Sequence, residues 1–125
     1  MTVTTHWVNE PWIFAVNLSE YVTMDDIRSV IGECVPLLRE HPIYFLIDMS
    51  SVSGFDSHIL EMSSLSEWIF HPNSRWFVYV RPTGLFKSIM KARQRGNFKA
   101  IDDRDAALEF LRRAAHAEQS NAQLF

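Results

Sequence analysis

The residues of this chain whose types and spacing could do chemistry are Asp56, Ser57 and His58, with Asp48 eight positions before Asp56. A serine hydroxyl beside a carboxylate and an imidazole could act as a nucleophile, or it could accept a phosphoryl group. Neighbouring residues in a helix do not face each other, and no nucleophile-elbow or oxyanion-hole pattern accompanies this serine. An enzyme built on Asp48, Asp56 and His58 is therefore the least favoured interpretation, and we expect no catalytic residue.

The elements that must position these residues are a strand and the helix after it. The apolar run Ile43–Ile47 leads into Asp48 and predicts a buried parallel strand. A serine- and glycine-rich turn is expected next, and a helix from Ser57, at a junction where binding often collects in open α/β sheets. Asp48 could position the turn that carries Asp56 and Ser57, or it could accept backbone N–H groups in an Asx turn. Asp56 or Ser57 could also simply cap the helix.

The whole chain predicts elements in the order β-β-α-β-α-β-α-β-α. This order defines an α/β fold with a mixed sheet, in which an antiparallel N-terminal hairpin is followed by parallel crossovers. We expect about five strands and about four helices. The strands are expected over residues 3–8, 11–18, 43–49, 76–80 and 98–101. The helices are expected from the N-cap Thr23, over 57–70, over 84–95 after the N-cap Thr83, and from 102 onward. Residues 1–116 are expected to form a single domain, and the polar residues 117–125 a flexible tail.

The first helix carries three local signals. Thr23 and Asp26 have the spacing of a capping box. Pro36 predicts a kink, or a helix end near Cys34. Cys34, the single cysteine, lies on the apolar stripe and is expected to be a buried, inert thiol.

Composition excludes several classes of protein. The chain has 125 residues, 47% of them hydrophobic, and a formal net charge of −3, which favours one globular domain and argues against a nucleic-acid binder. No apolar run approaches the roughly 18 residues of a membrane span, and the N-terminus lacks the pattern of a signal peptide, so we expect a cytoplasmic protein. The histidines have no metal-ligand spacing and no glycine-rich phosphate loop occurs, so no metal or cofactor is expected.

A basic segment runs from Arg81 to Ile101 without an acidic residue. It could be a solvated helix face, or a docking patch for an acidic partner, an anionic lipid surface or a nucleotide. Parallel packing should place its helix beside the one that begins at Ser57. Lys87, Lys91 and Arg95 are therefore candidate partner-binding residues.

The sequence also resembles a known family. Asp48-Met49-Ser50-x-Val52, followed by Asp56-Ser57-x-x-Leu60, resembles the signature of STAS domains, which include bacterial anti-sigma-factor antagonists and the cytoplasmic domains of sulfate-type anion transporters. The closing segment, residues 102–108, resembles the family's last helix. The resemblance implies a non-enzymatic bacterial signalling module that acts through protein–protein interaction, with an anti-sigma factor of the serine-kinase kind as partner.

In the antagonists, the partner kinase phosphorylates the serine that follows this aspartate. The resemblance therefore implies Ser57 as the switch, Asp48 and Asp56 as supporting residues, and His58 as part of the partner surface. A phosphate adds roughly −1.5 to −2 charges, and at a helix N-terminus it could accept free backbone N–H groups without unfolding the domain. His58 and Ile59 stand where the family commonly has a small residue and glycine, and this bulk should crowd a docking partner.

The alternative function is a small apolar-ligand or lipid-binding domain of the same fold. The helix expected over 57–70 could line its pocket with Met62, Leu65, Trp68, Ile69 and Phe70. An open apolar cavity between this helix and the one over 84–95 would favour the alternative, and a filled space would argue against it. Trp7, Trp12, Phe14 and Trp76 could be core residues; if helices cover one sheet face only, some would form an exposed patch and a homodimer interface.

Overall fold

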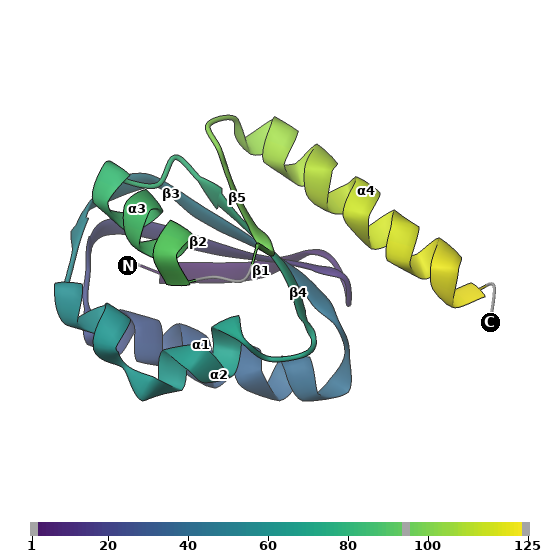
Figure 1. The fold of residues 1–125 in the computed structure, drawn as a ribbon, viewed down its shortest axis with the longest axis horizontal. Coiled ribbons are helices and arrows are strands. Elements are labelled where there is room, and N and C mark those ends of the chain that lie inside the picture. The colour runs from purple at the N-terminus through teal and green to yellow at the C-terminus, as the bar shows by residue number, and fades with distance from the viewer. Residues whose placement is uncertain (1–2, 94–95, 124–125) are drawn as a thin grey trace.

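The computed structural model describes residues 3–93 and 96–123, which form a five-stranded mixed sheet (Figure 1). The strands lie in the order β1-β2-β3-β4-β5. The first pair is antiparallel and every later pair is parallel, which confirms the predicted fold class. The strands are β1 (Val3–Asn9), β2 (Ile13–Val22), β3 (Ile43–Phe55), β4 (Ser74–Val80) and β5 (Phe98–Ile101).

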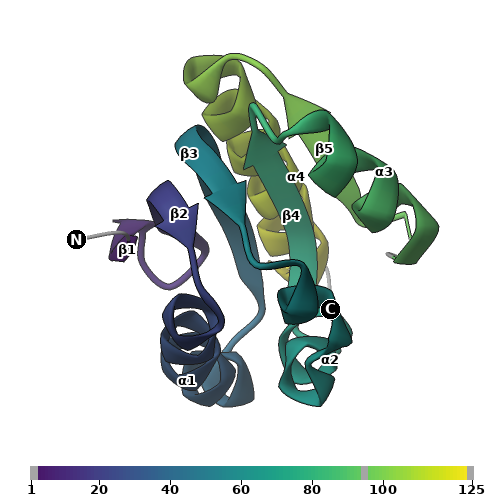
Figure 2. The same ribbon diagram turned by 90° about the vertical axis from the view of Figure 1, so that its left-hand side faces the viewer.

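Helices cover both faces of the sheet (Figure 2). Each parallel strand lies next to its predecessor in sequence, so right-handed crossovers place all the connecting helices on one face. The last helix follows β5 and packs on the opposite face, against β3 and β4 above all. Within the described residues, the helices are α1 (Met24–Glu40), the 3₁₀-helix η1 (Ser57–Glu61), α2 (Ser63–Ile69), α3 (Gly84–Arg93) and α4 (Arg104–Gln123).

These two layers explain why the central strands are apolar on both sides. Phe45 and Phe77 face the layer of α1, α2 and α3, where their rings stack with 5.1 Å between centroids. Trp68 of α2 meets Phe45 edge-on at 5.6 Å. Leu46 faces the other way and belongs to the cluster that contains Leu111 of α4. A strand buried on both faces has a continuous apolar sequence, as Ile43–Ile47 does.

The aromatic residues of the hairpin are divided between the two layers. Trp7 packs edge-on against Phe14 on the face of α1, with 4.9 Å between centroids. Trp12 and Trp76 are partly buried at the margin of the cluster under α4. Because both faces of the sheet centre are covered, these residues form core rather than an open apolar face. The homodimer stays a prediction.

The N-terminus of α1 confirms the capping box. The backbone N–H of Asp26 donates to the Thr23 hydroxyl, and the backbone N–H of Thr23 donates to the Asp26 carboxylate. The expected helix end near Cys34 is wrong, because α1 continues through Pro36 to Glu40. Pro36 and Gly32, whose carbonyl the proline leaves without a helical donor, both lie on the exposed side, where water can serve that carbonyl. Cys34 is fully buried, and burial raises the pKa of its thiol, as expected for an inert cysteine.

The turn expected after Asp48 is wrong, because β3 continues to Phe55. Ser51 pairs with Ser19 and Phe55 pairs with Val22, although the register shifts twice along this stretch. The cause is tertiary. β2 is longer than its alternating pattern predicted, and its extra residues supply the backbone partners that keep the serine- and glycine-rich segment extended.

Two helix boundaries also differ from the sequence expectation. The single helix expected over 57–70 is divided at Met62, whose extended backbone (φ −70°, ψ 123°) separates η1 from α2. α4 runs to Gln123, beyond residue 116, so the described part of the expected tail is helical. Glu118 holds this part of α4 to the sheet, because it accepts hydrogen bonds from Tyr44 (2.8 Å) and Arg75 (2.8 Å).

Candidate functional site

Ser57 lies where β3 ends and η1 begins, at a position we call the Ser57 corner (Asp56, Ser57 and His58). The backbone N–H of Asp56 donates to the carbonyl of Val22 (2.9 Å), which ties the corner to the end of β2. Asp56 is the N-cap of η1, since its Oδ1 accepts the backbone N–H of His58 (2.9 Å). Ser57 itself is exposed, and its hydroxyl makes no hydrogen bond to another described residue. The cap is therefore Asp56, and the serine hydroxyl is accessible.

The imidazole of His58 binds the same carboxylate, with Nδ1 2.9 Å from Oδ1 of Asp56. This hydrogen bond, followed by the charges of Asp56 and Glu61, raises the pKa of His58. In return, hydrogen bonds from the backbone N–H and the ring of His58 lower the pKa of Asp56. The ring is thus engaged with Asp56 and not with Ser57, so within the described residues the corner contains no Ser–His–Asp relay.

Asp48 belongs to a different arrangement, on the α4 side of the sheet. Its Oδ1 accepts the backbone N–H (3.0 Å) and the hydroxyl of Ser50, and its Oδ2 accepts Nη1 of Arg104 at 2.6 Å. The same Nη1 donates to Oδ1 of Asn17 (2.9 Å). Partial burial opposes ionisation of Asp48, but the hydrogen bonds from Ser50 and Arg104 outweigh it and lower the pKa of Asp48. Asp48 therefore joins β2, β3 and the start of α4. Of its two predicted roles, positioning the turn with Asp56 and accepting a backbone N–H, the structure has the second, with the N–H of Ser50 as donor.

Arg104 was missed as a site residue by sequence reasoning. It is the first residue of α4, where a cation opposes the helix dipole. This unfavourable placement was the feature of the sequence that could have indicated an ion pair with a distant carboxylate. An arginine in the first turn of a helix needs a carboxylate partner elsewhere, and Asp48 is that partner.

α3 lies beside the Ser57 corner, as the parallel topology predicted. Phe55, at the end of β3, meets Phe86 of α3 edge-on with 5.5 Å between centroids. Lys87 and Lys91 lie one turn apart on the exposed side of α3. They bring two positive charges to the helix that neighbours the corner. Arg95, the third predicted basic residue, lies outside the described residues.

Tyr21 is a second residue that sequence reasoning missed. Its side chain is 54% exposed, although it lies in β2, and its ring lies against Gly54 of β3, where an added Cβ would come within 3.4 Å of it. The β2–β3 register shifts between Glu20 and Tyr21, and Glu20 has a φ of 60°. Irregularities of this kind turn a side chain outward at a sheet edge. The signal in the sequence was Gly54, because a glycine within a strand allows an aromatic ring to pack directly against the backbone.

An apolar cavity of about 40 Å³ lies between the sheet and the helices α1, α2 and α3. The indole Nε1–H of Trp68, which lines it, is buried and has no hydrogen-bond partner. A neighbouring cavity of about 70 Å³ shares part of this lining and lies between α2 and α3. The residues common to both are Leu60, Leu65, Ile69 and Met90.

Residues 3–93 and 96–123 contain no group of three or more histidine, cysteine, aspartate or glutamate side chains arranged to hold a metal ion. Within the same ranges, no helix has both the length and the apolar character needed to cross a membrane.

The order of the strands and the helix layers on both faces of the sheet define the class of fold, a SpoIIAA-like α/β fold. No protein-family model and no curated protein matches the sequence. The structure of the anti-sigma factor antagonist SpoIIAA in its unphosphorylated form is similar with a TM-score of 0.70, at 9% identity over 88% of this chain and 97% of that chain. The phosphorylated form of the Bacillus cell fate determinant SpoIIAA gives 0.66, at 7% identity over 86% and 98%.

A protein of the DUF3478 family with a SpoIIAA-like fold, from Shewanella loihica PV-4, gives a TM-score of 0.64 at 18% identity, over 87% of this chain and 91% of that chain. These likenesses confirm a SpoIIAA-like, STAS-like fold for this chain.

Proposed function

We propose that this chain is a non-enzymatic protein-interaction module of bacterial signalling, of the anti-sigma-factor antagonist kind, switched by phosphorylation of Ser57. The observation that supports the proposal most is the exposed serine directly after a capping aspartate, at the β3–η1 junction of a SpoIIAA-like fold. The partner is a serine kinase that also serves as an anti-sigma factor. The surface of this chain that binds the kinase is centred on the Ser57 corner. Tyr21 lies on one side of it, and the exposed Lys87 and Lys91 lie on the neighbouring helix.

Phosphorylation acts here through surface charge. A phosphoserine adds roughly −1.5 to −2 charges at neutral pH. The backbone offers this group little, because Asp56 already accepts the N–H groups of His58 (2.9 Å) and Ile59 (3.1 Å) with its side chain and carbonyl. The phosphate therefore stays in water, beside the Asp56 carboxylate. A partner that closes over the corner must desolvate that charge, which is costly, so docking is lost until the phosphate is removed.

The test is phosphorylation by a serine-kinase anti-sigma factor from the same organism, with ATP, followed by peptide mass spectrometry. We expect one phosphate on Ser57 and none in Ser57→Ala. Ser63→Ala is the matched control, because Ser63 is also exposed and opens α2 only six positions later. Binding of the kinase should weaken at least ten-fold, about 1.4 kcal/mol, in Ser57→Asp. Phosphate on another residue, or equal binding by Ser57→Asp and the original chain, would contradict the switch.

The second candidate function, an apolar-ligand or lipid-binding domain, is favoured by one observation. The unpartnered Nε1–H of Trp68 borders an apolar cavity, and a buried donor without an acceptor is costly, by about 1–3 kcal/mol. A ligand with an apolar tail and a carboxylate or carbonyl would supply the acceptor. A volume of about 40 Å³ has room for a few water molecules only, at roughly 10–15 Å³ each, so such a ligand requires α2 and α3 to move apart.

Titration with decanoic acid, followed by NMR of the indole N–H resonances, tests this candidate. A saturable downfield shift of the Trp68 resonance, assigned by its loss in Trp68→Phe, would support binding in the cavity. Trp76, on the opposite face of the sheet, is the internal control. No shift, or equal shifts of both resonances, would exclude the site.

A further inference from the structure

β1 is an edge strand, and its outer side is open. Among the described strands it pairs with β2 alone, at one end of the sheet order. In an antiparallel pair, every second residue of such a strand turns its N–H and C=O away from its partner. The pairing is regular from Val3 to Trp7, and the register shifts only between Trp7 and Asn9. The outer side of β1 is therefore a straight template for one more strand.

The sequence of β1 does not protect this edge. Proteins normally block an open edge with lysine, proline, an inward charge or a very short strand. The seven residues of β1, VTTHWVN, contain no lysine, arginine, acidic residue or proline, and several are β-branched. The opposite edge, β5, differs on both counts, since it has four residues and carries Lys99. The β5 edge therefore has two features that prevent pairing with another strand, and the β1 edge has neither of them.

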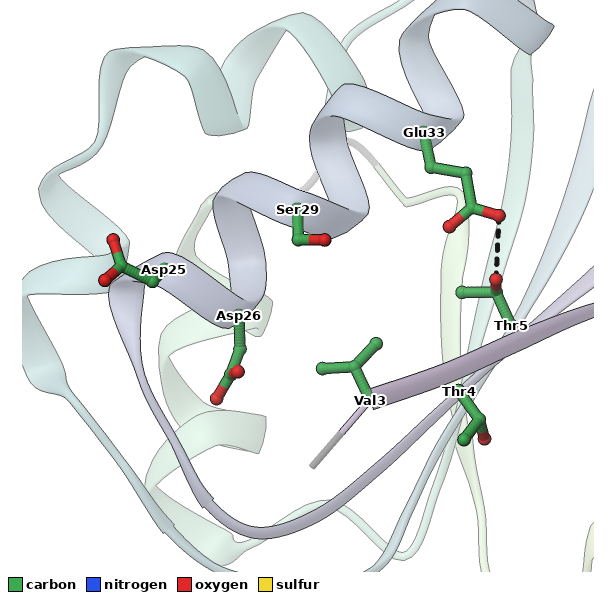
Figure 3. A pocket seen from close by; sticks show the side chains of 7 residues that line it. All are labelled: Val3, Thr4, Thr5, Asp25, Asp26, Ser29 and Glu33. Carbon is green, nitrogen blue, oxygen red and sulfur yellow. Dashed lines mark hydrogen bonds between the residues drawn. The ribbon is translucent and has the colours of Figure 1, made fainter. Parts of the chain in front are cut away.

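An acidic groove of about 620 Å³ lies along this edge, between β1 and α1 (Figure 3). Val3 and Thr5 point into it from β1, and Thr4 lines it from the other side of the strand, so the groove includes the strand edge itself. Ser29 and Glu33 face it from α1. The full lining is Val3, Thr4, Thr5, Asp25, Asp26, Ser29 and Glu33, three carboxylates and no basic side chain.

Glu33 carries the charge that matters most to this groove. Asp25 is paired with Arg28 at 2.7 Å, and Asp26 caps α1. Glu33 instead accepts a hydrogen bond from the neutral hydroxyl of Thr5 (2.7 Å), and no cationic side chain of residues 3–93 or 96–123 forms an ion pair with it. Its carboxylate lies directly above the strand edge, at the level of Thr5.

We propose that the β1 edge and its groove bind an extended basic segment of a partner protein, which adds a sixth strand to the sheet. The backbone of the segment pairs with Val3–Trp7, and its alternate side chains point to the α1 side, as those of Val3 and Thr5 do. Lysine or arginine at these alternate positions meets Glu33 and the neighbouring carboxylates. This site is separate from the Ser57 corner, and neither depends on the other.

The probe is a fluorescent seven-residue peptide that alternates lysine and threonine, measured by anisotropy, with hydrogen exchange of the β1 amides as the structural readout. Two control peptides divide the proposal into its parts. Glutamate in place of lysine removes the charge complementarity. N-methylation of every backbone amide keeps the charge but removes the N–H groups needed for strand pairing. Glu33→Gln tests the groove, and Glu67→Gln, an equal loss of charge at an exposed position of α2, is its matched control.

We expect saturable binding of the lysine peptide, slower exchange of amides in Val3–Trp7, and a dissociation constant at least five-fold higher in Glu33→Gln but unchanged in Glu67→Gln. Both control peptides should bind at least ten-fold more weakly. Equal binding of the N-methylated peptide would overturn strand addition, and equal effects of the two glutamate variants would overturn the groove. Protection of β1 amides that rises with protein concentration in the absence of peptide would overturn the proposal in favour of a second copy of this chain.

Discussion

The ion pair between Asp48 and Arg104, called the tie below, links β3 to the first turn of α4. Its removal should lower the free energy of unfolding by an amount that the structure allows us to estimate. Arg104→Met keeps most of the apolar stem of the side chain and deletes the donor to Asp48 and Asn17. A hydrogen bond between charged groups contributes about 1.5–3 kcal/mol when well shielded. Asp48 is 16% exposed and Arg104 35%, so solvent screening reduces this to about 1–2 kcal/mol of unfolding free energy.

A matched pair on the same helix supplies the control. Arg113 bonds to Glu109 at 2.8 Å, but these side chains are 80% and 55% exposed. Arg113→Met should therefore cost about 0–0.5 kcal/mol. Urea unfolding followed by tryptophan fluorescence measures both variants, and the melting temperature of Arg104→Met should fall by roughly 3–8 °C.

A double-mutant cycle with Asp48→Asn isolates the tie itself. We expect a coupling energy of about 1 kcal/mol between positions 48 and 104. The pKa of Asp48 is lowered from its ordinary value of 3.8 in the folded state, so the stabilisation is present above pH 3.8 and is lost as the pH falls through the folded-state pKa. Equal losses in Arg104→Met and Arg113→Met, or a coupling below about 0.3 kcal/mol, would refute the reasoning.

Four further outcomes are expected. Pro36→Ala should raise the free energy of unfolding by about 1–2 kcal/mol, because it restores a helix hydrogen bond at an exposed position; an unchanged urea midpoint would contradict this. The pKa of His58, followed by NMR, should lie above 6.5 and fall towards it in Asp56→Asn; the pair therefore stabilises the fold between pH 3.8 and 6.5 and loses this effect as the pH rises through the raised pKa of His58 or falls through the lowered pKa of Asp56, and an unchanged titration would show that the ion pair is absent. Cys34 should react with a thiol reagent only in urea, and rapid labelling of the folded protein would disprove its burial. Tyr21→Ala should weaken kinase binding at least ten-fold, whereas Phe70→Ala, at the other exposed large apolar residue described, should not; equal effects would remove Tyr21 from the docking surface.

The order and type of the elements could be predicted because their signals are local. Thr23 and Thr83 both cap the helices they were expected to cap. The apolar runs of β3 and β4 indicated strands buried on both faces, and right-handed crossovers then left few arrangements of the helices. The accessible position of Ser57 followed from its place between a strand and a helical turn.

The remaining features depend on contacts between distant residues. Ser50–Phe55 has the composition of a turn, and it is strand only because β2 extends to Val22 beside it. Asp48 and Ser57 stand nine positions apart in one motif, yet Asp48 bonds to Arg104, a partner 56 positions away. The polar end of α4 suggested a tail, because nothing local indicates that Glu118 reaches Tyr44 and Arg75.

In the described part of the chain, α1, η1, α2 and α3 cover one face of the sheet and α4 covers the other, and this division affects synthesis of the protein. α4 follows the five described strands along the chain, and among the described helices it is the one that covers Ile13, Leu46 and Val78. Until α4 has left the ribosome, the strands that emerged earlier present these side chains to water. The nascent chain therefore exposes an apolar surface until α4 emerges. During this interval a chaperone can bind that surface.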